Sequence, residues 1–227
     1  MTLPPPPSTP PGIELAIFDL DGVLAELDRA RRLAILAEMT GKDPALLHAA
    51  IWTSDFERRA EAGAYPTGAE YLAEFNRRIG AALERGQWIR ARREAMQPRA
   101  DVLRLAEALR AECDITLLTN NGSLLHEALP EIVPVVHRLF GERAHASFQF
   151  GARKPEPEVF ERLLARYAVP AARAVFIDDD PAYVAGARRV GLHTVRYAGL
   201  PDLECQLHAL GLSSAARARL AGQRGPR

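Results

Sequence analysis

The sequence predicts an α/β fold, a doubly wound parallel sheet with helices on both faces and a helical domain inserted after the first strand. Two observations lead to this prediction. Short, nearly unbroken apolar runs alternate with amphipathic segments of helix length, which is typical of strands buried on both faces by helices. The alternation is interrupted once, by residues 25–97, where helical patterns follow one another without a strand-like run.

Length and charge exclude several classes of protein. The 227 residues suit one globular domain, or one domain that carries a smaller insert. Basic and acidic residues balance at 29 each, so bulk charge predicts neither a nucleic-acid partner nor attachment to an anionic membrane. No apolar run approaches the ~20 residues of a membrane-spanning helix. We expect a monomer or a weak homodimer.

The two cysteines and the N-terminal residues indicate the compartment. Cys113 and Cys205 form neither a disulfide framework nor a metal-binding spacing, which favours a reducing, cytoplasmic setting. The start of the chain, MTLPPPPSTPPG, lacks the basic beginning and the apolar core of a signal peptide. We therefore expect a cytoplasmic protein.

The first part of the chain is predicted to contain a tail, one strand and a cap. Residues 1–12 hold six of the 17 prolines and are predicted to be an extended, disordered tail. The first strand is predicted at 13–18 (IELAIF), within a first core segment that spans 13–24. Residues 25–97 are predicted to form a helical cap, with helices in the stretches LDRARRLAILAEMT, DPALLHAAIWT, PTGAEYLAEFNRRIGAAL and RGQWIRARREAMQ. Because an insertion at the carboxyl end of a strand lies over the ligand-binding edge of such a sheet, we expect this cap to act as a lid.

Helices and strands alternate again in a second core segment, 98–212. Amphipathic helices are predicted at 98–112, 155–169 and 180–191, the first with proline near its start and the last closed by glycine. Strands are predicted at 115–119 (ITLLT), 174–177 (AVFI) and 192–197 (LHTVRY), with a weaker candidate at 145–150 (HASFQF). The basic tail, 213–227, is predicted to be flexible.

Polar residues follow the predicted strands at their carboxyl ends, which lie along one edge of a parallel sheet. They are Asp19 and Asp21, Thr119 and Asn120, Asp178 to Asp180, and Lys154 just after the weak strand. Acidic side chains that face one another would repel, and a divalent cation resolves the repulsion. Carboxylate and carbonyl oxygens suit Mg²⁺, which works beside a phosphate group. Lys154, Thr119 and backbone N–H groups would then donate to the phosphate oxygens.

Four motifs in this order resemble those of the haloacid dehalogenase-like hydrolase superfamily. They are DLDGV (19–23), LLTNNG (117–122), RKPEPEVF (153–160) and FIDDDPAYVAGARRVGL (176–192), and they span nearly all of residues 13–197. Each motif alone is a weak signal, whereas the ordered set is specific. The helical gap after the first motif resembles the branch of the superfamily that carries a helical (C1) cap on a Rossmann-like core.

The resemblance implies a role for each motif residue. Asp19 resembles the nucleophile that attacks phosphorus and forms an aspartyl-phosphate. Asp21 resembles the acid/base that protonates the leaving alcohol and then activates water. Thr119 and Asn120 match the position that orients the phosphoryl group, and Lys154 matches the lysine that holds the phosphate and the nucleophile. Asp178 and Asp179 match the acidic pair that positions Mg²⁺ together with Asp19 and the backbone carbonyl of Asp21, and Asp179 is favoured as the direct ligand.

Other charged residues have simpler interpretations. Arginine fills 27 of the 29 basic positions. A lysine at position 154 therefore indicates a site that requires a compact point charge. Asp180 is predicted to cap the helix that follows it. Arg92 and Arg93 are interpreted as part of a solvated helix face.

The cap segment 51–75 resembles that of sugar-phosphatase-like and phosphoglycolate-phosphatase-like members of the branch. Trp52, Phe56 and Arg58 are candidates for contact with the leaving group, followed by Tyr65 and Asn76. The alternative is that the aromatic residues pack inside the cap, as large aromatics at helical spacing usually do.

These features predict a Mg²⁺-dependent phosphatase that hydrolyses a small phosphorylated metabolite. One alternative is a 2-haloacid dehalogenase, whose family usually has an aromatic residue where this chain has Asp21. Another is a sugar phosphomutase, which would carry a histidine at the cap entry, where residues 24–32 (LAELDRARR) have none. A non-catalytic binding module is the last alternative, and the complete set of motif residues does not favour it.

Overall fold

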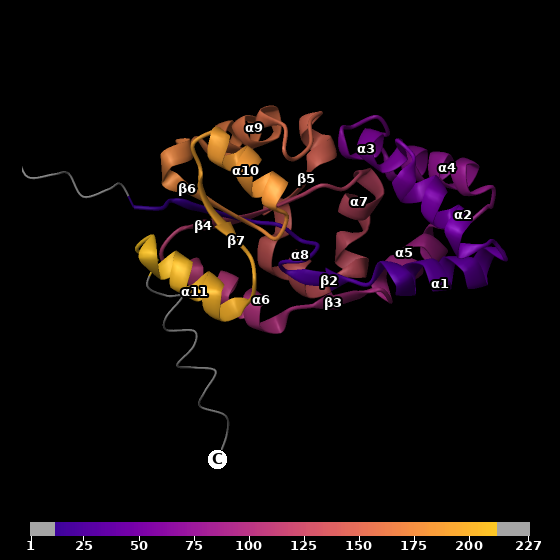
Figure 1. Ribbon diagram of the computed structural model, residues 1–227, viewed down its shortest axis with the longest axis horizontal. Helices are drawn as coiled ribbons and strands as arrows, with labels where there is room; N and C mark the ends of the chain where they lie inside the picture. The colour runs from indigo at the N-terminus through magenta and orange to yellow at the C-terminus, as the bar shows by residue number, and fades with distance from the viewer. Residues whose placement is uncertain (1–11, 213–227) are drawn as a thin grey trace, which may run out of the picture.

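A five-stranded parallel sheet with strand order β5-β4-β1-β6-β7 forms the centre of the protein (Figure 1). The computed structural model describes residues 12–212, so the predicted tails, 1–12 and 213–227, lie outside the described residues apart from Gly12. The strands are β1 (Leu15–Phe18), β4 (Asp114–Thr119), β5 (Ala144–Ala146), β6 (Ala174–Asp178) and β7 (His193–Arg196). The predicted α/β fold with a helical insertion is confirmed.

Helices cover both faces of this sheet. Every residue of β1 is apolar, so both sides of the strand must be shielded from water, and all four residues are buried. Alternate side chains of a strand point to opposite faces. Leu15 and Ile17 pack in the cluster of α9 (Pro157–Tyr167) and α10 (Pro181–Arg189). Ala16 and Phe18 pack in the larger cluster, which contains the buried residues of α6 (Ala100–Leu109), α8 (Pro134–Phe140) and α11 (Leu200–Ala209).

The register of the central strands brings their carboxyl ends level. Phe18 pairs with Leu117 on β4 and with Ile177 on β6. The residues that follow these pairs therefore reach the same edge of the sheet. This alignment places Asp19, Thr119 and Asp178 together.

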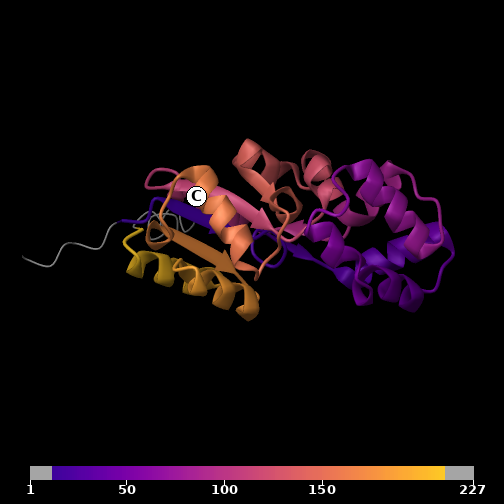
Figure 2. The ribbon, with the colours of Figure 1, turned by 90° about the horizontal axis from the view of Figure 1, so that it is seen from above.

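The inserted helices form a separate layer beyond that edge. In Figure 2 the strand arrows point toward helices α1–α5 at one end of the molecule. Their bounds are α1 (Arg29–Thr40), α2 (Pro44–His48), α3 (Phe56–Glu61), α4 (Gly68–Ile79) and α5 (Arg85–Arg93), with a π-helical turn at Ala49–Thr53. Phe56 at the centre of this layer lies 5.1 Å from Tyr71 and 6.0 Å from Phe75, measured between ring centroids.

The prediction that residues 25–97 contain no strand is wrong at both ends. β2 (Ala25–Leu27) pairs antiparallel with β3 (Met96–Pro98), with Glu26 opposite Gln97. Strands of three residues are too short to show a two-residue periodicity, so the sequence pattern could not separate them from helix. The predicted boundaries of the cap fall within this two-stranded link, and they stay a prediction.

Some core elements also differ from prediction. The candidate strand at 145–150 is a strand only at its start, and Ser147–Phe150 forms a 3₁₀ turn. Helices α7 (Ser123–Ile132), α8 and α11 were not predicted, and Pro130 inside α7 interrupts the usual helical signal. Within residues 12–212, no helix is both long enough and apolar enough to cross a membrane.

Candidate active site

Lys154 joins two carboxylates at the sheet edge. Its ammonium nitrogen lies 2.8 Å from Oδ1 of Asp19 and 2.6 Å from Oδ2 of Asp178, and its side chain is fully buried. Burial alone would lower the pKa of Lys154, but the charges of Asp19 and Asp178 raise it. Burial raises the pKa of Asp19 well above its usual range, while the neighbouring ammonium opposes this increase. The three groups form one buried charge network.

Asp19, Asp178 and Asp179 together could hold a metal ion. One carboxylate oxygen from each can be chosen so that all three lie within 4.8 Å of one another. A set of oxygen donors with one exposed member, Asp179, suits Mg²⁺, which binds carboxylates and keeps several waters. Partial burial, then the charge of Asp178, raises the pKa of Asp179. The donor chemistry therefore fits the predicted cofactor.

The backbone around β6 holds this cluster in place. Oδ1 of Asp178 accepts a 2.8 Å hydrogen bond from the backbone N–H of Asp180. The side chain of Asp180 accepts a 2.7 Å hydrogen bond from the N–H of Ala182 and so caps α10, as predicted. Asp178 is therefore oriented from both sides, by Lys154 and by the turn.

Gly22 allows Asp179 to approach the end of β1. Its φ is +95°, a conformation that side-chain-bearing residues rarely adopt. A Cβ atom at this position would lie 2.5 Å from Oδ2 of Asp179. The glycine of the DLDGV motif is thus required both for the turn and for the space that this carboxylate occupies.

Asn120 and Thr119 support the site in different ways. Asn120 makes two hydrogen bonds of 2.9 Å with the backbone of Lys154, one to its carbonyl and one from its N–H. It therefore fixes the loop that carries the lysine, and it also lines the cleft described below. Oγ1 of Thr119 is buried and accepts a 2.8 Å hydrogen bond from Asn121.

Asp21 is held by two residues that sequence reasoning did not select. Its Oδ2 accepts hydrogen bonds from Nη2 of Arg92 at 2.6 Å and from Nδ2 of Asn121 at 3.2 Å. Its Oδ1 is buried and has no hydrogen-bond partner among the described residues. The interpretation of Arg92 as solvated is wrong, because it is 3% exposed, whereas Arg93 is exposed as expected. Only the helical spacing of Arg92 from Trp88, four residues earlier on α5, could have indicated its burial.

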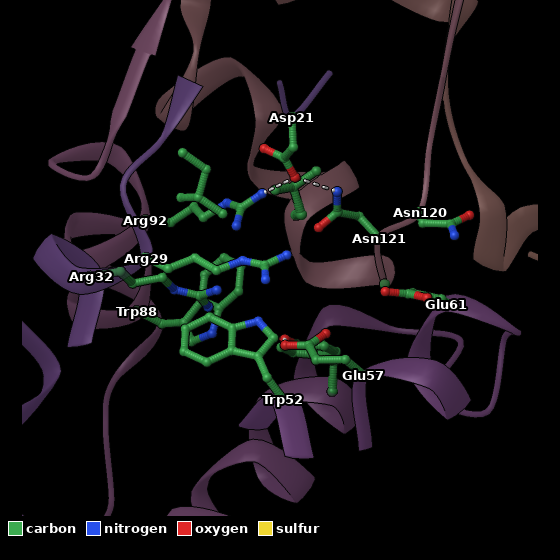
Figure 3. A pocket seen from close by; sticks show the side chains of 14 residues that line it. Asp21, Arg29, Arg32, Trp52, Glu57, Glu61, Trp88, Arg92, Asn120 and Asn121 are labelled. Carbon is green, nitrogen blue, oxygen red and sulfur yellow. Dashed lines mark hydrogen bonds and ion pairs between the residues drawn. The ribbon is translucent and has the colours of Figure 1, made fainter. Parts of the chain in front are cut away.

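A cleft lies between the cap and the edge of the sheet (Figure 3). It encloses about 480 Å³ including its open mouth, and Asp21, Asn120 and Asn121 form its core side. The cap side contains Trp52, one of the candidate cap residues, together with a set of mostly charged and aromatic residues, namely Leu27, Arg29, Arg32, Glu57, Glu61, Tyr71, Trp88 and Arg92.

The other cap candidates do not line this cleft. Phe56 is fully buried and packs within the cap, in contact with Tyr65, so the alternative interpretation applies to both. Arg58 is exposed. Asn76 bonds through its side chain to the backbone of Leu83 and closes the end of α4.

Several contacts hold the cap against the core. Nε of Arg153, next to Lys154, lies 2.5 Å from a carboxylate oxygen of Glu61 on α3. Ser147 donates a 2.8 Å hydrogen bond to the carbonyl of Glu61, and the N–H of Gly68 donates a 2.7 Å bond to Glu127. Burial raises the pKa of Glu61 to about 7, while the charge of Arg153 opposes this rise. The cap is therefore closed over the site.

Comparisons with known proteins agree with this arrangement. Protein CbbY of Cereibacter sphaeroides is 27% identical over 210 residues, which cover 81% of this chain and 83% of that protein. A structure described as a predicted HAD-like family hydrolase from Porphyromonas gingivalis matches with a TM-score of 0.73 and 25% identity over 86% of this chain and 98% of that one. A HAD family enzyme of Bacteroides thetaiotaomicron, solved with magnesium and inorganic phosphate, shares the fold, with a TM-score of 0.69 and 22% identity over 83% of this chain and 96% of that one.

A family model extends the agreement across most of the chain. The model described as haloacid dehalogenase-like hydrolase matches residues 13–191. This match spans β1 with Asp19 directly after it, the inserted helices, Lys154 and the acidic turn after β6. The chain therefore belongs to the haloacid dehalogenase-like hydrolase family.

Proposed function

We propose that this protein is a phosphatase that hydrolyses the phosphate monoester of a small metabolite in a Mg²⁺-dependent reaction. The observation that carries the proposal is the buried ammonium of Lys154 between Asp19 and Asp178, with Asp179 beside them. A fixed cation next to a carboxylate nucleophile and an oxygen-lined metal site is suited to a phosphoryl group. The relative solved with magnesium and inorganic phosphate supports this proposal.

In the first step, an oxygen of Asp19 attacks phosphorus and the bond between phosphorus and the ester oxygen breaks. Lys154 holds Asp19 in place and donates to the phosphoryl oxygens. Asp21 gives its proton to the departing alcohol, so the alcohol leaves as a neutral molecule. Mg²⁺, when bound by Asp19, Asp178 and Asp179, supplies positive charge that offsets the repulsion between carboxylate and phosphate.

In the second step, water attacks the phosphorus of the aspartyl-phosphate, which releases phosphate and restores Asp19. Asp21 now accepts the proton of the attacking water, because it lost its own proton in the first step. Asp21 lines the cleft where the leaving group lies, which suits both roles. An aspartate at this position favours a phosphatase over a dehalogenase, which needs neither the acid/base nor the metal.

The test is hydrolysis of p-nitrophenyl phosphate by the purified chain with MgCl₂. We expect turnover that EDTA abolishes and that Asp19→Asn removes, while Asp202→Asn, an exposed position on α11, keeps it. Activity that survives both EDTA and Asp19→Asn contradicts the mechanism. Halide release from 2-haloacids without metal would identify a dehalogenase, transfer of phosphate between sugar positions a phosphomutase, and phosphate binding without turnover a binding module.

The sugar-phosphatase-like branch, a monomeric or weakly dimeric state and a cytoplasmic location stay predictions. Sedimentation at several protein concentrations tests the oligomeric state directly.

A further inference from the structure

Arg32 on α1 is a buried cation whose hydrogen bonds are incomplete. Its side chain lines the cleft although the residue is only 2% exposed. Its Nε and Nη2 have no hydrogen-bond partner among the described residues. Buried donors are normally satisfied because an unpaired one costs free energy. Because Arg32 lines the cleft and two of its nitrogens have no partner within residues 12–212, a ligand in the cleft could accept hydrogen bonds from it.

Two indole rings hold this guanidinium in place. The Cζ atom of Arg32 lies 5.5 Å from the ring centroid of Trp52 and 5.2 Å from that of Trp88. Both distances are typical of cation–π contacts, which favour the charged form and limit side-chain motion. Nε1 of Trp88 is also buried without a partner in the described part of the chain. Because Trp88 also lines the cleft, this N–H is a second donor that a ligand there could satisfy.

Charge is divided between the two walls of the cleft. Figure 3 shows Arg29, Arg32 and Arg92 entering from one side and Glu57 facing them from the other. Asp21 pairs with Arg92, and Glu57, which accepts a 2.8 Å hydrogen bond from the hydroxyl of Tyr71, also acts on Arg32 through its charge. Against the single charge of Glu57 this wall carries both Arg29 and Arg32, which is an excess of positive charge above the edge of the sheet.

We propose that this wall, Arg32 with Arg29 and Trp88, binds a second anionic group on the leaving part of the substrate, either a carboxylate or a further phosphate. The proposal rests on the proposed function, and it names the class of ester that the site selects. The planar guanidinium fits the paired oxygens of either group, and the indole N–H adds a further donor. A neutral polyol could accept hydrogen bonds from Arg32 but would add no negative charge to that of Glu57.

The experiment compares esters that differ only in the distal group. One pair is 3-phosphoglycerate and glycerol 3-phosphate, in which a carboxylate replaces a hydroxymethyl group. The other pair is propane-1,3-diol bisphosphate and propane-1,3-diol monophosphate. We expect the anionic member of at least one pair to have a kcat/KM at least tenfold higher than its neutral partner, chiefly through a lower KM. The pair that shows the preference identifies the anion.

Variants of α1 connect the preference to Arg32. Arg32→Gln should reduce the ratio of anionic to neutral kcat/KM to near one. Arg31→Gln is the matched control, because Arg31 is exposed and its guanidinium lies 3.5 Å from a Glu94 oxygen, outside the cleft. If Arg32→Gln does not fold, Arg32→Lys keeps the charge without the planar fork and should retain only part of the preference. A wild-type ratio near one, or a ratio that Arg32→Gln leaves unchanged, would overturn the proposal.

A binding measurement separates this proposal from the proposed function. Calorimetric titration of Asp19→Asn protein with each ester requires no turnover. If the wild type hydrolyses p-nitrophenyl phosphate but neither pair shows a preference, the phosphatase stands and the anion site fails. If no ester is hydrolysed, the proposed function fails. The anion site is then supported independently if the anionic member binds at least tenfold more tightly than its neutral partner and if Arg32→Gln removes this difference. Equal binding of both members then contradicts it.

Discussion

Gly22 is the residue at which the chain leaves β1 for the cap, and its missing side chain is as important as the carboxylates around it. Gly22→Ala should disturb Asp179, because the new Cβ would lie 2.5 Å from Oδ2 of that carboxylate. We expect a loss of stability of roughly 1–2 kcal/mol from the left-handed backbone and at least a tenfold loss in Mg²⁺ affinity. Calorimetric titration with MgCl₂ and thermal unfolding measure the two effects.

Gly41→Ala is the matched control for this substitution. Gly41 also has a positive φ, of 67°, but a Cβ atom added there would meet no other atom within 4 Å. It should lose stability through the backbone alone and keep its Mg²⁺ affinity. Equal Mg²⁺ affinity in both variants would show that Gly22 does not shape the metal site.

Arg92 is the residue that fixes the proposed acid/base. Arg92→Gln should lower kcat on p-nitrophenyl phosphate at least tenfold, because Asp21 loses its 2.6 Å ion pair and adopts other orientations. Thermal stabilisation by MgCl₂ should persist, since Arg92 does not contact the metal carboxylates. Arg93→Gln, one position along and exposed, should retain wild-type kcat. Equal activity of the two variants would remove Arg92 from the mechanism.

Sequence alone predicts part of this site. Asp19, Lys154, Asp178 and Asp179 meet as expected, because strand ends in a parallel sheet converge whatever the details of packing. Arg92 could not be distinguished from Arg93 by residue type. Its role depends on the rotation of α5 about its axis, which is set by the tertiary packing of Trp88.

At the scale of elements, α3 is joined to the core by the ion pair of Glu61 and Arg153. The pKa of Glu61 is about 7 in the folded protein and lies near 4.5 when the residue is unperturbed. Between these values the folded protein binds more protons than the unfolded chain, so its stability falls as pH rises from about 4.5 to 7. Glu61→Gln should remove this part of the pH dependence. Urea unfolding at pH 5 and pH 7.5 measures it.

Glu107→Gln serves as the control for this measurement. Glu107 lies on α6 in an exposed pair with Arg110 and takes no part in the ion pair of Glu61 and Arg153. Its variant should follow the pH profile of the wild type. If the stability of Glu61→Gln depends on pH in the same way as that of the wild type, the pKa of Glu61 does not differ between the folded protein and the unfolded chain, and the prediction is wrong.

The elements of the core were easier to predict than those of the link to the cap. Strands β1, β4 and β6 are continuous apolar runs because both faces are covered, and this gives a clear signal. β2 and β3 exist because they pair with each other over three residues. Such pairing depends on a partner some seventy positions away, which no local pattern reveals.

For the whole molecule, the acidic cluster should make stability depend on the metal. A ligand that binds only the folded state adds about 2.7 kcal/mol at a hundred times its Kd. MgCl₂ should therefore raise the Tm, EDTA should reverse the rise, and Asp179→Asn should abolish most of it. Asp202→Asn, exposed on α11, should respond like the wild type. An unchanged Tm across millimolar MgCl₂ would contradict a Mg²⁺ site.

The ion pair between Asp21 and Arg92 has a consequence for exchanging the inserted helices of this protein. The carboxylate belongs to the core, whereas its arginine comes from the inserted helices. The insert is therefore not an independent specificity module. A chimera that receives the cap of a relative would leave Asp21, the proposed acid/base, without its counter-ion unless the donor cap carries an arginine at the same place. A change of leaving group by exchange of cap helices in this protein should therefore retain Arg92 on α5.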